Sequence, residues 1–171
     1  MRTFLPALCL FLLFSTSNAQ IYRNYDKLLS AGVRYATFNK EVPEYEFIPV
    51  NASLENIFID KWVGHKMAVG GGIETGYFQY IIGTHTYEVV QLSLLVNFHY
   101  TFNRQFEIFA GMLPGYYFDS YENTSIDASG MDGFNNQFMF GARYFIIEKL
   151  GIYTRMVIDD FGAEAGLTFK F

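Results

Sequence analysis

The sequence has few of the residues that soluble proteins place at their surface or use as cross-links. Charged residues make up only 17% of its 171 residues, against about a quarter in a typical soluble domain. The single cysteine, Cys9, has no partner for an intrachain disulfide and provides no thiolate metal site. No run of about 18 consecutive apolar residues occurs, which argues against a transmembrane helix. The net charge of −5 provides no basic surface for nucleic acid, so we expect no nucleic-acid partner.

Apolar and aromatic residues are abundant instead. Hydrophobic residues account for 51% of the chain and aromatic residues for 19%, with 19 Phe and 13 Tyr. This composition excludes a disordered chain, because so much apolar surface would not stay in water. The length suits a single domain of ordinary size.

The first 19 residues have the composition of a secretory signal peptide. Arg2 supplies a positive charge before an apolar run at residues 4–14, which is too short to span a bilayer. Ser17 and Ala19 then occupy the small-residue positions of a cleavage site before Gln20. We therefore predict an exported protein, with a signal peptide over residues 1–19 and one mature domain over residues 20–171.

Apolar residues alternate with small or polar residues through most of the mature chain. Over residues 89–102, every second position is apolar, starting at Val90, and the positions between them include Gln91, Asn97 and His99. Residues two apart share one face of a strand, so this pattern predicts a long amphipathic strand. Similar alternation predicts strands over residues 29–37, 68–77, 106–119, 138–146, 150–159 and 163–171. An eighth, less regular strand is expected between residues 39 and 65, around residues 54–62.

This alternation fits two kinds of barrel, which differ in whether the apolar row faces the interior or the exterior. A lipocalin-like carrier turns its apolar row inward, whereas a membrane barrel turns it toward lipid. The polar row here consists mostly of Gly, Ala, Ser and Thr rather than the Lys and Glu of a water-facing row. We therefore predict an all-β, eight-stranded antiparallel up-and-down transmembrane β-barrel, with Tyr and Phe near the strand ends at both membrane interfaces.

The polar rows place charges of both signs inside the predicted barrel. The predicted interior network contains four basic and four acidic residues: Arg34, Arg143, Arg155, Lys170, Glu74, Glu107, Asp159 and Glu164. Because an unpaired buried charge costs several kcal/mol, we expect these groups to pair. Eight strands leave an interior just wide enough for side chains. The sequence therefore predicts a plugged barrel rather than a wide pore.

The predicted connections alternate in length. Residues 103–105 and 147–149 form short turns, whereas residues 39–52 and 120–135 are long and polar. Outer-membrane barrels have short periplasmic turns and longer external loops. We expect any extracellular or envelope protein partner to bind the two long loops.

Taken together, these features resemble the small outer-membrane β-barrel family of Gram-negative bacteria. This family belongs to the porin-like barrels and includes the OmpX and OmpA-barrel types. The resemblance rests on the signal peptide, the eight alternating strands and the terminal segment from Ala163 to Phe171. It implies insertion among outer-membrane lipids with both termini in the periplasm. Leu167, Phe169 and Phe171 resemble the C-terminal signal by which such barrels reach the barrel-assembly machinery.

No catalytic, metal or cofactor site stands out in the sequence. Of the three histidines, His65, His85 and His99, none has the serine and acidic partners of a hydrolase at a recognisable spacing. We interpret His99 as a hydrogen-bonded interior residue. The Gly70-Gly71-Gly72 run predicts a bulge, a bend or the close approach of a bulky side chain.

The sequence thus predicts the architecture of the protein but says little about its activity, because one fold hosts many functions. We expect a non-enzymatic outer-membrane protein without cofactor or metal, with a structural or surface-interaction role. A lipid-modifying enzyme, a narrow channel for small solutes and a soluble carrier are the alternatives.

Overall fold

The computed structural model describes residues 22–23, 25–37, 45–62, 66–82, 85–120, 133–158 and 162–171. These residues form eight strands and no helix long and apolar enough to cross a bilayer. The strands are β1 (Lys27–Thr37), β2 (Tyr45–Lys61), β3 (Met67–Ile82), β4 (His85–Thr101), β5 (Phe106–Ser120), β6 (Gly133–Phe145), β7 (Leu150–Val157) and β8 (Gly162–Lys170).

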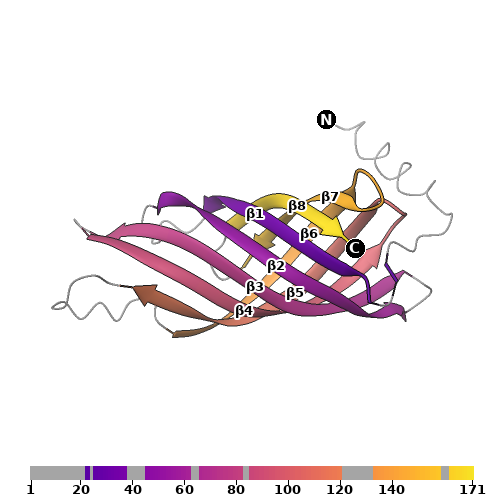
Figure 1. Cartoon of the computed structure of the whole chain (residues 1–171), viewed down its shortest axis with the longest axis horizontal. Coiled ribbons are helices and arrows are strands. Elements are labelled where there is room, and N and C mark those ends of the chain that lie inside the picture. Colours follow the sequence, from indigo (N-terminus) through magenta and orange to yellow (C-terminus); the bar gives the residue numbers. More distant parts are fainter. Residues whose placement is uncertain are drawn as a thin grey trace, which may run out of the picture.

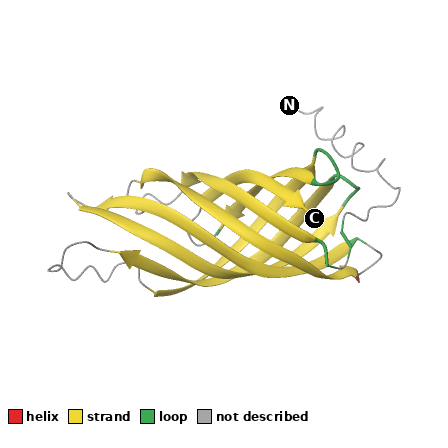
Figure 2. Ribbon diagram, in the orientation of Figure 1, coloured by secondary structure: helices red, strands yellow, loops and turns green. Residues whose placement is uncertain are grey.

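Each strand pairs antiparallel with the next one in the sequence, and β8 returns to pair with β1. Leu29 lies opposite Phe169 and Val33 opposite Ala165 along this closing seam. Figures 1 and 2 show the tilted strands winding around a single cylinder. Closure satisfies the backbone groups that an open sheet would leave unpaired at its edges. The predicted eight-stranded up-and-down barrel is confirmed.

The apolar rows face outward. Along β4, the side chains of Val90, Leu92, Leu94, Val96 and Phe98 are between 39% and 61% exposed. The alternate positions from Gln91 to Thr101 are at most 5% exposed. This arrangement is that of a transmembrane barrel and the reverse of a lipocalin-like carrier, whose apolar row would line the interior.

The two ends of the barrel differ in their connections. At one end, which we call the turn end, short turns at residues 102–105 and 146–149 join β4 to β5 and β6 to β7, and a bridge between Trp62 and Met67 closes the connection from β2 to β3. The start of β1 also lies there, because the amide of Lys27 donates to the carbonyl of Phe171 over 2.9 Å. The opposite end, the loop end, carries the remaining four connections. The two predicted short turns are thus confirmed.

The second strand is longer than predicted. It begins at Tyr45 rather than near residue 54, so part of the predicted loop at residues 39–52 is strand. The register of β2 against β3 shifts between Tyr45 and Phe47, between Phe47 and Val50, and between Ile57 and Ile59. Each irregularity breaks the period of two, which explains why the alternation was weak there. Likewise, β5 extends to Ser120 and β6 begins at Gly133, so the predicted loop at residues 120–135 is shorter; residues 39–44 and 121–132 lie outside the described residues.

The glycine run on β3 permits the close approach that the sequence indicated. A Cβ atom on Gly70 would meet the carboxylate of Glu55, and one on Gly72 would meet the backbone of Leu54. The register shift between Ile57 and Ile59 lies beside this run. Glycine therefore allows the backbone of β2 to approach β3 closely and the Glu55 side chain to lie against the inner surface of β3.

Candidate functional site

Arg155 on β7 forms the centre of one interior charge cluster. Its Nη1 and Nη2 donate to Oε2 and Oε1 of Glu74 over 2.7 and 2.5 Å, and its Nε donates to Oε2 of Glu164. Arg34 Nη2 lies 3.5 Å from Glu164 Oε1, and Asn51 Nδ2 donates to that same oxygen over 2.9 Å. We call these five residues the central cluster. Its charged groups are buried or nearly so, which makes their pairing necessary for stability.

The central cluster joins opposite walls of the barrel. Glu164 faces both Arg34 and Arg155 in the register of neighbouring strands, so these contacts run along the wall. Glu74, however, lies on β3, four strands away from β7 around the cylinder. The fork of Arg155 therefore crosses the lumen to reach it, and the planar guanidinium suits such a two-point contact with a carboxylate.

A second cluster lies near the turn end. Arg143 Nη1 donates to Glu107 Oε1 over 2.6 Å, and the two residues are register partners on β5 and β6. His99 lies between two carboxylates, with Nε2 2.8 Å from Glu55 Oε1 and Nδ1 3.4 Å from Glu107 Oε1. An imidazole with both nitrogens protonated donates to both carboxylates at once. With Tyr22, these residues form what we call the turn-end cluster.

Tyr22 enters this cluster from the segment before β1. Its hydroxyl donates to Glu107 Oε1 over 2.6 Å and accepts from Arg143 Nη1 over 2.7 Å. Its ring meets His99 edge-on at 5.0 Å between centroids and Phe145 at 6.2 Å. Burial holds the pKa of the Tyr22 hydroxyl well above its usual value, so the hydroxyl stays neutral and remains a donor.

Apolar side chains complete the closure around Tyr22. They form one buried cluster with it: Leu28, Ile57, Ala68 and Phe145. The turn end of the lumen is thus filled by one tyrosine, its polar partners and a small apolar layer.

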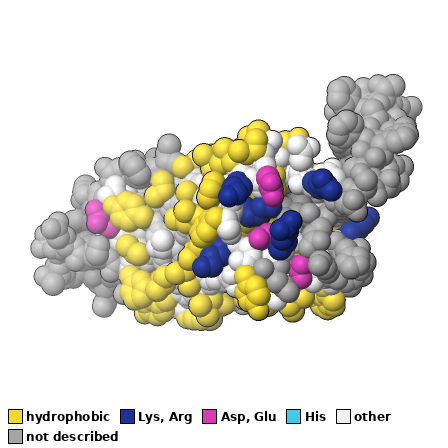
Figure 3. Space-filling view, turned by 45° about the vertical axis from the view of Figure 1, so that its right-hand side comes forward, with side chains coloured by type: hydrophobic (Ala, Val, Ile, Leu, Met, Phe, Trp, Pro, Cys, Tyr) yellow, Lys and Arg dark blue, Asp and Glu magenta, His cyan; other side chains and the backbone are white. Residues whose placement is uncertain are grey.

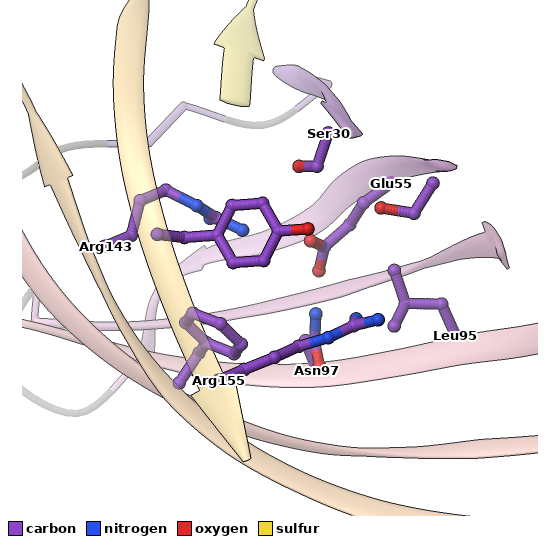
Figure 4. A pocket seen from close by; sticks show the side chains of 9 residues that line it. Ser30, Glu55, Leu95, Asn97, Arg143 and Arg155 are labelled. Carbon is purple, nitrogen blue, oxygen red and sulfur yellow. The ribbon is translucent and has the colours of Figure 1, made fainter. Parts of the chain in front are cut away.

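A small polar cavity lies between the two clusters. Glu55, Asn97 and Arg143 line it together with Arg155, and Figure 4 shows these side chains converging on the same space. Its volume of ≈ 10 Å³ is about the room that one water molecule needs. Asn97 Oδ1 and Arg143 Nε have no hydrogen-bond partner among the described atoms. The cavity therefore suits a bridging water and is too small for a substrate.

Toward the loop end, the interior polar groups of the described residues are mostly uncharged. Gln91 Nε2 donates to Ser93 Oγ over 2.9 Å and to Gln137 Oε1 over 3.0 Å. Gln137 Nε2 in turn donates to the hydroxyl of Tyr117 over 2.6 Å. Hydrogen-bonded amides and hydroxyls thus continue the side-chain filling beyond the central cluster.

Comparisons with known proteins match this chain in structure but not in sequence. No protein-family model matches it, and no curated protein matches it in sequence. Solved structures do match. The crystal structure of Ail, the attachment invasion locus protein of Yersinia pestis, is 10% identical, with a TM-score of 0.54, covering 87% of this chain and 100% of Ail. A de novo designed transmembrane β-barrel is 12% identical, with a TM-score of 0.51, covering 88% of this chain and 98% of the design.

The shared feature is the fold of small transmembrane β-barrels. Identities of 10% and 12% carry no information about activity or partners. The two structural matches agree with the closed barrel described above.

Most residues of the predicted interior network lie inside the barrel. Arg34, Glu74, Arg155 and Glu164 meet in the central cluster, whereas Glu107 and Arg143 meet in the turn-end cluster. Lys170 belongs to neither cluster, because its Nζ lies over the Phe145 ring, 5.4 Å from the centroid, at the turn end. Asp159 lies outside the described residues.

Two members of the turn-end cluster, Glu55 and Tyr22, could not be predicted from the sequence. Glu55 is 2% exposed, but it lies in the strand whose alternation is interrupted by register shifts. Tyr22 precedes the first strand, where no periodic pattern applies. The one available signal was a lone carboxylate, Glu55, between the apolar residues Leu54 and Ile57.

His99 is placed for structure rather than for acyl transfer. It is completely buried, and both of its ring nitrogens face carboxylates instead of a hydroxyl nucleophile. His65 and the side chain of His85 lie outside the described residues. Within the described part of the chain, no group of three or more His, Cys, Asp or Glu side chains is arranged to hold a metal ion.

Aromatic rings gather where the strands reach the barrel ends. At the turn end, Phe102 lies 5.1 Å from Tyr100 and 5.5 Å from Phe106 between ring centroids. At the loop-end half of β5, Tyr116 and Phe118 lie 4.9 Å apart. Such rings are typical of the two interfaces of a membrane barrel.

The predicted assembly residues face outward at the end of β8. Leu167, Phe169 and Phe171 are all exposed, and the rings of Phe169 and Phe171 stack 6.0 Å apart. They are therefore accessible on the outer wall of the barrel.

Proposed function

We propose that this chain is an integral outer-membrane β-barrel of a Gram-negative bacterium, exported with residues 1–19 removed, and that its role is structural or surface-interacting rather than enzymatic. The observation that carries the proposal is the combination of an exposed apolar wall with a buried charge network. In water this wall would expose far more contiguous apolar surface than a soluble protein tolerates. In a bilayer the same wall contacts hydrocarbon, and the charges stay inside.

Membrane fractionation with a heat-dependent gel shift tests this proposal. The protein should appear in the outer-membrane fraction, require detergent for release, and run as a compact species unless it is heated. N-terminal sequencing of the mature protein should begin at Gln20. Recovery from the periplasm without detergent would contradict the proposal and favour a soluble carrier.

The interior is proposed to be closed to solutes. Three features support closure: the fork from Arg155 to Glu74 across the lumen, the Tyr22 closure at the turn end, and a cavity with room for about one water molecule. In planar bilayers, the purified protein should therefore give no large, stable conductance. Sustained openings would favour the alternative of a narrow small-solute channel.

The absence of enzymatic activity is also part of the proposal. It is supported by the carboxylates that face both nitrogens of His99 and by the small volume of the polar cavity between the two charge clusters. The protein can be incubated with lipopolysaccharide and the lipid analysed by mass spectrometry. An unchanged acyl pattern is expected, and a changed pattern would favour a lipid-modifying enzyme.

A surface role would use the connections at the loop end. The structural match Ail is named the attachment invasion locus protein, and we propose that residues 38–44 and 121–132 of this chain bind an extracellular or envelope protein partner. Replacing residues 121–132 with a short Gly-Ser linker should abolish binding of that partner to whole cells while the gel shift is retained.

The outward residues at the end of β8 are proposed to deliver the chain to the barrel-assembly machinery. Deletion of Phe171 should reduce the amount of folded protein in the outer membrane, whereas Phe171→Trp, which keeps a large aromatic terminus, should not.

A further inference from the structure

Exposed basic side chains surround the barrel at its turn end. Arg23 and Lys27 flank the start of β1, Lys66 lies between β2 and β3, Arg104 between β4 and β5, and Lys149 between β6 and β7; all five are exposed. Because the strands follow one another around a closed cylinder, these residues are distributed around its whole circumference. Figure 3 brings this end forward and shows Lys and Arg side chains gathered on it, next to the hydrophobic band. We call the five residues the basic rim.

The described carboxylates leave the basic rim positively charged. None of the ion pairs between described residues involves a member of the rim. Outside the turn-end cluster, the acidic residues described at this end are Asp26, Asp60 and Glu148, and Asp26 accepts a hydrogen bond from the backbone amide of Arg23 over 2.9 Å. The rim therefore has cationic side chains available for an external anion.

The opposite end of the barrel has the reverse charge. Its four connections, residues 38–44, 83–84, 121–132 and 159–161, contain seven acidic residues and one lysine. An anionic surface would therefore be repelled from the loop end and attracted to the turn end.

Large apolar side chains adjoin the basic rim. Tyr25 is 77% exposed, Trp62 50%, Ile147 61% and Phe171 53%. Each lies within a few residues of a rim cation along the chain or, for Phe171, across a backbone hydrogen bond to Lys27. Exposed rings of this kind lie at the boundary between hydrocarbon and headgroups. The cations beside them extend to headgroup level, since Lys and Arg lay their stems along apolar surface and direct their charge outward.

We propose that the basic rim binds the phosphates of anionic glycerophospholipids in the leaflet around the turn end. This site rests on the proposed function, because it requires the barrel to span a bilayer. A rim that follows the whole circumference matches a ring of surrounding lipids, whereas a protein partner would dock on one side. Each basic residue near an anionic membrane surface strengthens binding to that surface about fivefold. The attraction acts within a Debye length of about 8 Å at physiological salt.

Trp62 allows these lipids to be measured directly. It is the only tryptophan in the chain, and it lies at the rim with half of its surface exposed. Lipids brominated on their acyl chains therefore quench the fluorescence only when they lie beside the turn end. Protein in phosphatidylcholine bilayers would receive equal small fractions of brominated phosphatidylglycerol or brominated phosphatidylcholine. We expect about a fivefold preference for phosphatidylglycerol, reduced in 1 M salt, where the Debye length is about 3 Å.

Variants of the rim separate charge from other effects. The triple variant Lys66→Gln, Arg104→Gln and Lys149→Gln, which keeps only Arg23 and Lys27 of the rim, should lower the preference. The matched triple variant Lys66→Arg, Arg104→Lys and Lys149→Arg keeps every charge and should keep the preference. Glu88→Gln, which changes an exposed charge near the loop end, should also leave it unchanged.

Three results would overturn the lipid site. These are equal quenching by the two brominated lipids in the wild-type protein, an unchanged preference in the triple glutamine variant, and displacement of brominated phosphatidylglycerol by lipid A more readily than by unlabelled phosphatidylglycerol. The last would assign the rim to lipid A phosphates. A different result, no quenching of Trp62 even by brominated phosphatidylcholine, would contradict membrane insertion itself, so the two proposals fail in distinguishable ways.

Discussion

Replacing Arg155 by methionine should be the most damaging single change in the described interior. Within the described chain, the hydrogen bonds of the Glu74 carboxylate come from Arg155, whereas Glu164 keeps Arg34 and Asn51. Arg155→Met therefore leaves Glu74 buried at 3% exposure without the cation that donates hydrogen bonds to it. Removing one partner of a buried ion pair costs about 3–5 kcal/mol. The free energy of unfolding should fall by that amount.

The double variant Arg155→Met with Glu74→Met makes the reasoning specific. Replacing a whole buried pair by apolar side chains of similar volume is often close to neutral. We therefore expect the double variant to be more stable than Arg155→Met alone, with a coupling energy of about 2–3 kcal/mol. Arg104→Met is the matched control, because Arg104 is exposed and forms no described ion pair. It should stay within about 0.5 kcal/mol of wild type.

Urea unfolding in lipid vesicles measures these differences, with Trp62 fluorescence and the heat-dependent gel shift as two independent signals. The charge network would be unnecessary for stability if Arg155→Met and Arg104→Met had the same effect. The absence of coupling between Arg155 and Glu74 would likewise refute the role assigned to the fork across the lumen.

Three further substitutions test other parts of the barrel by the same unfolding assay. Tyr22→Phe removes a hydroxyl that joins two buried charged groups, and should cost about 1–3 kcal/mol; an unchanged stability would mean that the tyrosine only fills space. Gly72→Ala places a methyl group against the backbone of the neighbouring strand and should destabilise the barrel, whereas Gly133→Ala meets nothing within 4 Å and should not. Leu94→Arg introduces a charge on the lipid face near the middle of β4 and should cost about 2–4 kcal/mol, against about 0–1 kcal/mol for Ile147→Arg at the turn end; equal costs would argue against a bilayer around the barrel.

The fold could be predicted because most strands keep a strict period of two. Along β4 the unbroken alternation from Val90 onward identified both the strand and its outward face. The second strand was located only roughly, because three register shifts move its side chains between faces. The same shifts concealed Glu55, whose inward position depends on how many residues are inserted before it.

Which charges lie inside could be predicted, but most of their partners could not. Glu107 and Arg143 face each other on adjacent strands, so their contact depends only on local register. Contact between Arg155 and Glu74 depends on the width and tilt of the whole cylinder, since 81 positions separate them in the sequence. Tyr22 escaped prediction for another reason: it follows no periodic pattern and acts through one hydroxyl and one ring.

The seam between the first and last strands has a consequence for closure of the barrel. Lys27 and Phe171 exchange two backbone hydrogen bonds, so β1 stays unpaired on one side until β8 joins the barrel. A chain that stops before Gly162 would retain two unpaired sheet edges and would also lack the outward aromatic residues Phe169 and Phe171. Completion of the cylinder and display of those aromatic residues therefore depend on the same nine-residue strand, and a prematurely terminated chain would lose both.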